Sequence, residues 1–354
     1  MILNIINISN NRIVKFIKED RLLLFQNLDQ EDILNISNFS FLKDLELTKI
    51  IKNFHKIDLD KVKNRLDFFS IKYVTILDEA YPQRLINIYD PPAILYFKGD
   101  LSYLDNSLAL VGSRKPSPYG IWATKKIVQG LSIADISIVS GMALGIDRIA
   151  HESAIEAGLK TVGVLASSID IQYPRSNMDL YGKMHDQLLV SEHCLNVYPL
   201  RLNFVLRNRL ISGLSLGVLV AEASQKSGSL ITANYALDQG RDVFAIPGQI
   251  DSKLSQGTND LIKRGAKLIS GAEDILEEYP FLKELDKVNA FYEKLNLTDN
   301  SLKIIRELKS GNKSINYLSF NCGIKIEEIY SILINLEMKG LIYRVTSDQY
   351  GLKI

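Results

Sequence analysis

The distribution of glycine constrains this chain more than any other sequence feature. The 354 residues include 21 glycines, none before Gly99, and 16 of them fall between Gly112 and Gly271. Glycine is needed where a backbone turns sharply or approaches a ligand closely. This distribution of glycine therefore predicts three parts: a helical N-terminal part, a core built on tight turns, and a small C-terminal part.

Within the glycine-rich core, short apolar runs alternate with segments of helical periodicity. The expected strands are 108–111, 136–140, 161–165, 187–192, 216–223 and 242–246, and the expected helices are 118–134, 146–158, 177–185, 204–213 and 229–239. Continuous apolar strands separated by helices are typical of a parallel sheet covered on both faces. The predicted fold class is α/β, a doubly wound, Rossmann-like and mostly parallel sheet. Its ligands should bind beyond the carboxyl ends of the strands.

Smaller parts are expected on either side of this core. The domains predicted are a helical N-terminal domain over 1–80, the Rossmann-like core over 81–280, a linker over 281–297 and a C-terminal domain over 298–354. Apolar residues three and four apart predict N-terminal helices at 11–27, 28–36, 40–54 and 58–69. Because this part lacks glycine, a packing or interaction module is favoured over a hairpin that binds phosphate through glycine amides.

The C-terminal domain has a winged-helix pattern. Helices are predicted at 298–310, 314–321 and 325–339, followed by strand-like runs at 341–345 and 350–354, with Thr298 and Ser314 as N-caps and Gly340 as the final stop. Its third helix is net acidic, whereas a helix that reads the major groove presents Arg, Lys, Asn or Gln to the bases. Protein contact or packing is therefore favoured there over base readout.

Charge and cysteine content narrow the class of protein further. With 42 Lys+Arg against 41 Asp+Glu the net charge is +1, which excludes a strongly basic nucleic-acid wrapper, so any anion site must be local. Two distant cysteines and histidines without metal-ligand spacing argue against a disulfide scaffold or a metal site. No apolar run is long enough to cross a membrane and the N-terminus lacks signal-peptide features, so a cytoplasmic protein is expected.

Glycine and arginine follow the first two strands of the predicted sheet. Gly112, Ser113 and Arg114 end the first strand, where successive amides can form an anion-binding nest and the guanidinium can bind phosphate. Gly141 ends the second strand and opens a turn into a helix that contains Asp147, for which helix capping is favoured over holding a neighbouring loop. Small residues at such a turn allow a phosphate to approach a helix N-terminus.

Later strand ends extend the same pattern. Arg175 lies in a polar loop beside Tyr173, for which a buried structural role is favoured over a stacking face. Asn208 is flanked by two arginines that point to different sides of a helix, and Arg209 is weakly favoured over Arg207 for the ligand. Ser227, Gly228 and Ser229 begin a further helix, where hydroxyls and free amides can hold an anion. Several such turns at one sheet edge predict a shared phosphate-binding groove.

Signals for catalysis are weak. The sequence contains no GxxxxGK[ST] loop for nucleotide phosphates and no GxSxG nucleophile elbow. His151 follows the Asp147 turn by one helical turn, and a structural role is its default interpretation. No catalytic residue and no cofactor is assigned.

Taken together, the segments closely resemble the DNA-processing protein A family (DprA, also called Smf). The resemblance runs from YPQRLINIYDPPAILYFKGDLSYL (81–104) through VGSRKPSPYG (111–120), SGMALGID (140–147) and DIQYPRSN (170–177). It continues through RNRLISGLS (207–215), SGSLITANYALDQGRDVFAIPG (227–248) and GTNDLIKRGAKLI (257–269). These motifs span roughly 80–275, in family order.

The resemblance implies a protein, not known as an enzyme, that binds single-stranded DNA and promotes loading of the recombinase RecA in natural transformation. It implies a SAM-like N-terminal domain, a Rossmann-like core and a homodimer formed through 248–270, with RecA contacts nearby. The residues it places on the DNA are Gly112, Ser113, Arg114, Gly141, Arg175, Asn208, Arg209, Ser227, Gly228 and Ser229.

Two other functions remain open at this point. A phosphoribohydrolase-like, nucleotide-processing enzyme could use a related core, with Glu222 nearest to its catalytic glutamate, but the PGGxGTxxE signature is lacking. A transcription factor could read duplex DNA through the winged helix, which the acidic third helix does not favour.

Overall fold

The computed structural model describes residues 59–282, 298–308, 311–346 and 348–352. The helices predicted before residue 58 and most of the predicted linker lie outside these ranges. The chain divides into two compact units, Met1–Leu282 and Lys283–Ile354.

A nine-stranded sheet forms the centre of the first unit, in the order β1-β2-β6-β5-β4-β3-β7-β8-β9. The seven strands from β6 to β9 along this order are parallel, while β1 and β2 run antiparallel at one edge. The predicted doubly wound, mostly parallel α/β fold is therefore confirmed. The strands are β1 (Lys72–Thr75), β2 (Ile94–Lys98), β3 (Ser107–Val111), β4 (Ser137–Ser140), β5 (Thr161–Val164), β6 (Leu188–Ser191), β7 (Gly217–Val220), β8 (Asp242–Ala245) and β9 (Lys267–Leu268).

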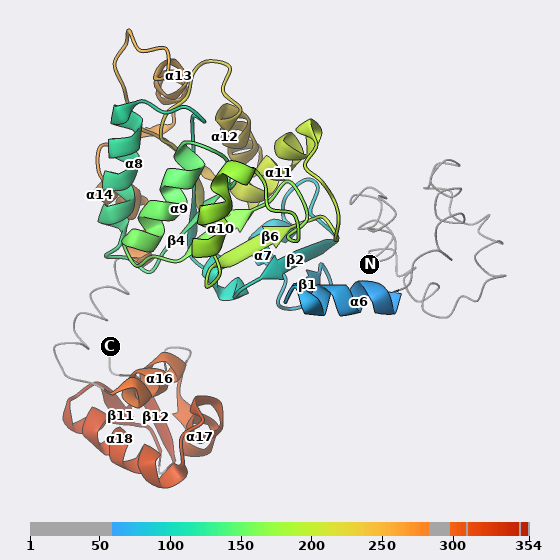
Figure 1. The fold of residues 1–354 in the computed structure, drawn as a ribbon. Coiled ribbons are helices and arrows are strands. Elements are labelled where there is room, and N and C mark those ends of the chain that lie inside the picture. The colour runs from blue at the N-terminus through green and yellow to red at the C-terminus, as the bar shows by residue number, and fades with distance from the viewer. Residues whose placement is uncertain (1–58, 283–297, 309–310, 347, 353–354) are drawn as a thin grey trace. The chain divides into compact units, whose positions relative to one another are not determined.

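Helices cover both faces of this sheet (Figure 1). On β3, Leu108 and Leu110 pack toward one group of helices, whereas Ala109 and Val111 pack toward the other, as the two-residue period of a strand requires. The first group is α8 (Pro118–Leu131), α9 (Ile146–Glu156) and α14 (Ala272–Glu278). The second is α7 (Gln83–Ile86), α11 (Arg201–Gly213), α12 (Ser229–Asp238) and α13 (Gln256–Lys263). Helices α6 (Leu59–Phe68) and α10 (Met178–Lys183) pack at the β2–β6 side.

The sheet extends beyond the strands that the sequence predicted. β1, which falls inside the predicted helical domain 1–80, pairs with β2 in the edge of the sheet. The sheet therefore begins before the predicted boundary at residue 81. The KYVT segment of β1 is only four residues long and half exposed, and its sequence lacks the apolar run that marks the central strands.

The second unit folds around its own apolar core, which includes Ile304, Leu318, Leu333 and Tyr350. Its described residues, from 298 onward, form three helices and a three-stranded antiparallel sheet in the order β10-β12-β11. The elements are α16 (Asp299–Leu308), β10 (Lys313–Ser314), α17 (Ile315–Cys322), α18 (Ile326–Met338), β11 (Ile342–Arg344) and β12 (Gln349–Leu352). The predicted helices and hairpin are thus present, with β10 as an addition.

The predicted helix ends of this unit are also present. The hydroxyl of Thr298 accepts a hydrogen bond from the amide of Ser301, and that of Ser314 accepts one from the amide of Tyr317, both at 3.3 Å. Gly340 follows α18 with a left-handed φ of 71°, which only glycine adopts without strain. Among the described residues, no helix is both long and apolar enough to cross a membrane.

His151 lies wholly inside the first unit, which confirms its structural role. Its Nδ1 lies 2.7 Å from the hydroxyl of Thr161, and that hydroxyl donates to the carbonyl of Ile138. Nδ1 therefore carries the proton, and the buried Nε2 has no hydrogen-bond partner among the described residues. Burial lowers the pKa of His151 to about 3.

This buried ring should make the fold sensitive to mild acid. The unfolded chain takes up a proton near pH 6.5 while the folded His151 does not, so stability falls as the pH drops below that value. Each pH unit below about 6.5 lowers the free energy of unfolding by about 1.4 kcal/mol, so the loss at pH 5 is roughly 2 kcal/mol. Denaturant unfolding at pH 7 and pH 5 should show this loss in the wild type and less of it in His151→Gln. The matched control is His185→Gln, which alters a ring on the surface. If His185→Gln changes the loss of stability between pH 7 and pH 5 as much as His151→Gln does, the acid sensitivity does not come from His151.

Candidate functional site

A cleft of about 630 Å³ opens where the sheet reverses its order. β3 lies between β4 and β7, so the connections from β3 and β7 leave in opposite directions and create a crevice at their carboxyl ends. The lining residues are Val111, Gly112, Ser113, Arg114, Ala143, Asp147, Tyr173, Arg201, Phe204, Val205, Arg207, Asn208, Ile211, Ser227, Gly228, Ser229, Ile231 and Thr232. The shared groove predicted at the strand ends therefore exists.

The loop after β3 is held rigidly at the bottom of this cleft. The amide of Ser113 donates to the carbonyl of Glu222 at 2.8 Å, and the amide of Ile146 donates to the carbonyl of Ser113 at 3.0 Å. Gly145 has a φ of 76°, and a Cβ there would lie 2.3 Å from the Ser113 oxygen, so only glycine fits. Since the Ser113 amide is already used, the predicted nest of free amides is not formed at this residue.

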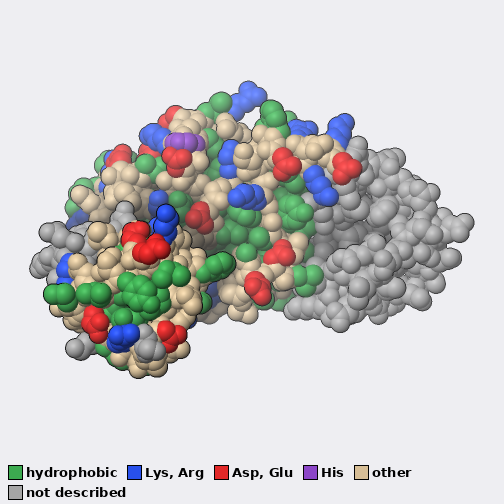
Figure 2. All heavy atoms as spheres, turned by 90° about the horizontal axis from the view of Figure 1, so that it is seen from below, with side chains coloured by type: hydrophobic (Ala, Val, Ile, Leu, Met, Phe, Trp, Pro, Cys, Tyr) green, Lys and Arg blue, Asp and Glu red, His purple; other side chains and the backbone are tan. Residues whose placement is uncertain are grey.

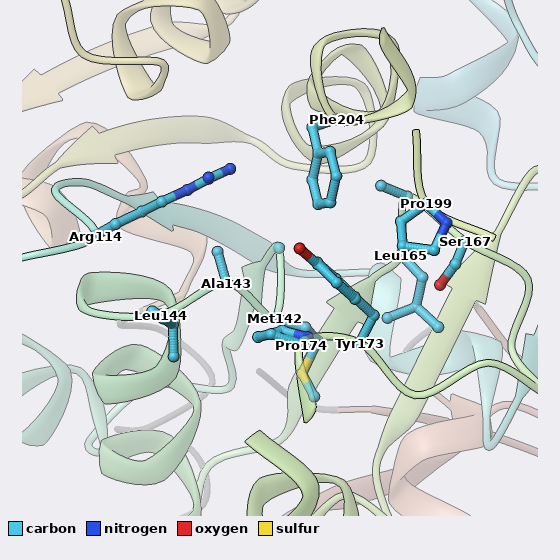
Figure 3. A pocket seen from close by; sticks show the side chains of 12 residues that line it. Arg114, Met142, Ala143, Leu144, Leu165, Ser167, Tyr173, Pro174, Pro199 and Phe204 are labelled. Carbon is cyan, nitrogen blue, oxygen red and sulfur yellow. The ribbon is translucent and has the colours of Figure 1, made fainter. Parts of the chain in front are cut away.

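Arg114 follows this anchored loop and is exposed. Its guanidinium lies 5.5 Å from the centre of the Phe204 ring, within the range of a cation–π contact. Figure 3 shows the side chain extending across the opening toward Phe204. No salt bridge to an acidic side chain is found for Arg114 within the described ranges, so its charge is available to a ligand.

Two buried side chains of opposite charge support the floor of the cleft. Arg207 is only 3 % exposed and donates to the carbonyls of Gly141, at 2.7 Å, and Val164. Asp147 accepts from the amides of Gly141 and Ala143 at 3.2 and 3.4 Å. Asp147 therefore holds the loop after β4 and does not cap α9, contrary to the favoured prediction.

Gly141 is required at this point because the charged pair approaches its backbone closely. A Cβ on Gly141 would lie 2.6 Å from Arg207 Nη2 and 2.8 Å from Asp147 Oδ2. Burial raises the pKa of the Asp147 carboxyl, while Arg207 and the two amides act in the opposite direction. Burial also lowers the pKa of Arg207, to about 10, so it remains charged at neutral pH. The floor thus combines fixed backbone dipoles with the guanidinium of Arg207 and the carboxyl of Asp147.

Helix α11 presents one side to the cleft and the other to an ion pair. At about 100° per residue, Arg207 and Arg209 point in nearly opposite directions. Arg207 lines the cleft, whereas Arg209 is 6 % exposed and its Nη2 contacts Glu192 at 2.5 Å. Its Nε also lies 3.6 Å from Asp90. The placement of Arg209 in the groove is therefore wrong in this structure, because acidic side chains on the far side of α11 hold it there.

Two aromatic rings, the exposed Tyr173 and the half-buried Phe204, border the cleft on the α11 side. Tyr173 is 46 % exposed, and its ring centre lies 5.7 Å from that of Phe204, so the favoured prediction of a buried Tyr173 was wrong. Both rings also border an adjoining slot of about 80 Å³ that Arg114 and Gly141 share. In Figure 3 Arg114, Tyr173 and Phe204 converge on this opening. Such rings offer flat faces on which bases can stack.

The start of α12 forms the opposite wall. The hydroxyls of Ser227 and Ser229 lie 2.7 Å apart, and the side-chain amide of Asn208 reaches the carbonyl of Gly228 at 3.4 Å. These groups bring hydrogen-bond donors to the wall that faces Arg114. No cluster of three or more metal-ligating side chains is found among the residues that the structure describes.

The structure brings most of the predicted site residues together. Seven of them line the cleft: Gly112, Ser113, Arg114, Asn208, Ser227, Gly228 and Ser229. Gly141 lines the adjoining slot, while Arg175 is exposed outside both and Arg209 is buried behind α11. Arg201, on the first turn of α11, was missed, since a lone arginine among leucines carries no signal in the sequence.

Fold and site together define a class: a doubly wound α/β protein with a cationic and aromatic cleft at its switch point. A family model described as DNA recombination-mediator protein A matches residues 72–280. The chain is 41 % identical over 262 residues to the DNA processing protein DprA of Streptococcus pneumoniae, covering 72 % of this chain and 90 % of that protein. Protein Smf of Escherichia coli is 38 % identical over 285 residues, covering 78 % and 76 %. The chain belongs to the DNA recombination-mediator protein A family.

Solved structures agree with this assignment. The X-ray structure of DprA from Streptococcus pneumoniae aligns with a TM-score of 0.70 at 38 % identity, over 78 % of this chain and 95 % of that one. A structure of DNA processing protein A from Helicobacter pylori, described for its single-stranded DNA binding mode, aligns with a TM-score of 0.53 at 32 % identity. That alignment covers 59 % of this chain and 95 % of the other. The fold and the general role in DNA processing and recombination therefore follow from the family.

Proposed function

We propose that this protein binds single-stranded DNA in the cleft and promotes the loading of RecA onto it during natural transformation and recombination. The observation that carries the DNA part is the convergence of Arg114 with Tyr173 and Phe204 at one opening. Single-stranded nucleic acid needs a cationic track for phosphates and flat rings for bases. The printed description of the Helicobacter pylori relative supports the same ligand.

The residues proposed to contact DNA have two roles. Arg114 and Arg201, which both line the cleft, would neutralise phosphates, while Ser113, Asn208, Ser227 and Ser229 would donate hydrogen bonds. Gly112, Gly141 and Gly228 would let the strand approach the backbone. Arg175, exposed beside the slot, would extend the path, and Arg209 would act only through the position of α11.

Phe204 provides a direct test of binding to unstacked bases. Phe204→Ala should weaken binding of a fluorescent oligothymidine about five- to a hundredfold, because stacking on an aromatic ring contributes roughly 1–3 kcal/mol per base. Blunt duplex DNA should bind more weakly than the single strand, since its bases are already stacked. The matched control is Leu206→Ala, on the same helix but outside the cleft lining. Equal affinities for single and double strands, or equal effects of the two variants, would refute the proposal.

Dimer formation through 248–270 and RecA contacts nearby are further parts of the proposal. β9, within this segment, is the outermost strand of the sheet, and Ile250 and Leu268 are 93 % and 45 % exposed. An exposed sheet edge with apolar side chains is a common site of pairing between chains. Light scattering that gives only the monomer mass at micromolar concentration would contradict the dimer.

If addition of the protein fails to speed RecA assembly on coated single strands, RecA loading is excluded while DNA binding stands. A cytoplasmic location remains part of the same proposal.

The hydrolase alternative receives no support from the position of Glu222. This carboxylate is 3 % exposed and accepts hydrogen bonds from the amide and hydroxyl of Ser117, at 2.8 and 2.5 Å, at the start of α8. It does not line the cleft that contains Arg114. A glutamate that acts on a glycosidic bond has to reach the ligand, and this one holds a helix end.

A further inference from the structure

One side of α18 in the second unit carries an exposed apolar stripe. Ile326, Tyr330, Ile334 and Met338 are 45, 47, 54 and 85 % exposed, and their four-residue spacing places them along one side of the helix. The neighbouring side, with Ile329, Leu333 and Leu336, is completely buried in the core of the unit. Hydrophobic side chains also gather on the surface of this unit in Figure 2. The stripe is therefore not needed for the core.

Two glutamates lie within the same sector of the helix. At about 100° per residue, Ile326 to Met338 span about 120° around the axis, and Glu327 and Glu337 fall inside this range. Both are exposed. Glu328 points about 100° away from Glu327, and its carboxylate accepts a hydrogen bond from Asn300 at 2.7 Å. The exposed face of α18 is thus apolar and acidic.

The apolar and acidic character of this face disfavours DNA and a second copy of α18 as partners, and it favours a helix with basic side chains. Carboxylates repel phosphate, so the face is unsuited to DNA. If two copies of α18 packed together antiparallel about the middle of the stripe, Glu327 of one would meet Glu337 of the other, and parallel packing would pair identical glutamates. Like charges facing each other in an apolar contact are costly. A helix that has apolar residues flanked by Lys or Arg complements both features.

We propose that this face of α18, defined by Ile326, Glu327, Tyr330, Ile334, Glu337 and Met338, binds a basic amphipathic helix of another protein. The apolar stripe would bury the apolar side of the partner, and the two glutamates would pair with its cations and set its orientation. The proposal is independent of the DNA cleft, which lies in the other unit, so the protein would hold a protein partner and a DNA strand by separate surfaces.

The experiment uses the full-length chain and two synthetic peptides of about 15 residues, long enough for a marginal helix. One repeats Leu and Lys at helical spacing, and the other has Glu in place of every Lys. Fluorescence anisotropy should show the Lys peptide binding at least about tenfold more tightly than the Glu peptide. Ile334→Glu and Glu327→Lys should each weaken the Lys peptide about tenfold, because one places a charge in the stripe and the other reverses the complementary charge.

The matched control is Glu328→Lys, which makes the same charge change on the neighbouring residue but off the stripe, and it should leave the affinity unchanged. The thermal unfolding midpoint and the affinity for a single strand, measured on every variant, show whether the fold is intact. If Ile334→Glu unfolds, Tyr330→Ser takes its place. Equal binding of the two peptides, or equal effects of Glu327→Lys and Glu328→Lys, would overturn the proposal. So would loss of a dimer in Ile334→Glu without any change in peptide affinity, since self-association would then explain the stripe.

Discussion

Replacing Arg114 by alanine is expected to weaken binding of a single strand about ten- to a hundredfold. The side chain is exposed at the mouth of the cleft and points across it (Figure 3). A hydrogen bond to a charged group contributes roughly 1.5–3 kcal/mol, and a guanidinium can make two to one phosphate. A titration of the variant with a fluorescent oligonucleotide at fixed salt measures the loss directly.

The salt dependence of binding tests the mechanism behind this loss. Each phosphate neutralised on a single strand contributes about 0.7 to the slope of log affinity against log salt, so Arg114→Ala should reduce the slope by about that amount. Arg114→Lys should keep the slope but lose part of the affinity, because an ammonium lacks the planar fork. Lys115→Ala is the matched control, since Lys115 is exposed on the same loop but does not line the cleft. Equal losses for Arg114→Ala and Lys115→Ala would mean that only general charge matters.

The second large effect concerns Arg207 and the stability of the fold. Arg207→Leu removes the cation that acts most strongly on the buried Asp147 and leaves the carbonyls of Gly141 and Val164 without this donor. Removal of one partner of a buried charge pair typically costs about 3–5 kcal/mol, which is a large share of the stability of a domain. Urea unfolding at pH 7 should show a lower midpoint with an unchanged slope.

A double variant separates the charge from the shape of the side chain. Arg207→Leu with Asp147→Asn removes both charges, so it should recover part of the loss caused by Arg207→Leu alone. Arg201→Leu makes the same substitution at an exposed position on the same helix and should change stability by less than about 0.5 kcal/mol. If Arg207→Leu is no more destabilising than Arg201→Leu, the pair does not support the floor of the cleft.

The sequence predicted the cleft well because its signals are local. An apolar run followed by a glycine marks the end of a buried strand, and parallel strands bring such ends to one edge. Gly112, Gly141 and the turn before α12 were located in this way. The edge strands β1 and β2 were not, since β2 pairs with β6 across more than 90 residues of sequence and β1 joins the sheet only through β2.

The choice between Arg207 and Arg209 shows where local patterns become insufficient. Helical periodicity separates the two side chains but does not tell which one faces the sheet edge. That choice depends on Glu192 and Asp90, which lie in other parts of the sequence and meet Arg209 only after β6 and α11 have packed. Tyr173 was misjudged for a similar reason, because its exposure depends on where Phe204 of α11 is placed.

The order of strands in the sheet also determines when the cleft can exist. β3 and β7 are neighbours, with Ala109 opposite Val218, although more than a hundred residues separate them in the chain. A ribosome releases these residues in sequence, so a nascent chain that ends before β7 has the Arg114 loop but lacks the opposite wall. Contacts between such distant segments also form slowly. If the cleft binds single strands as proposed, a nascent chain would acquire that affinity only after β7 has been synthesised.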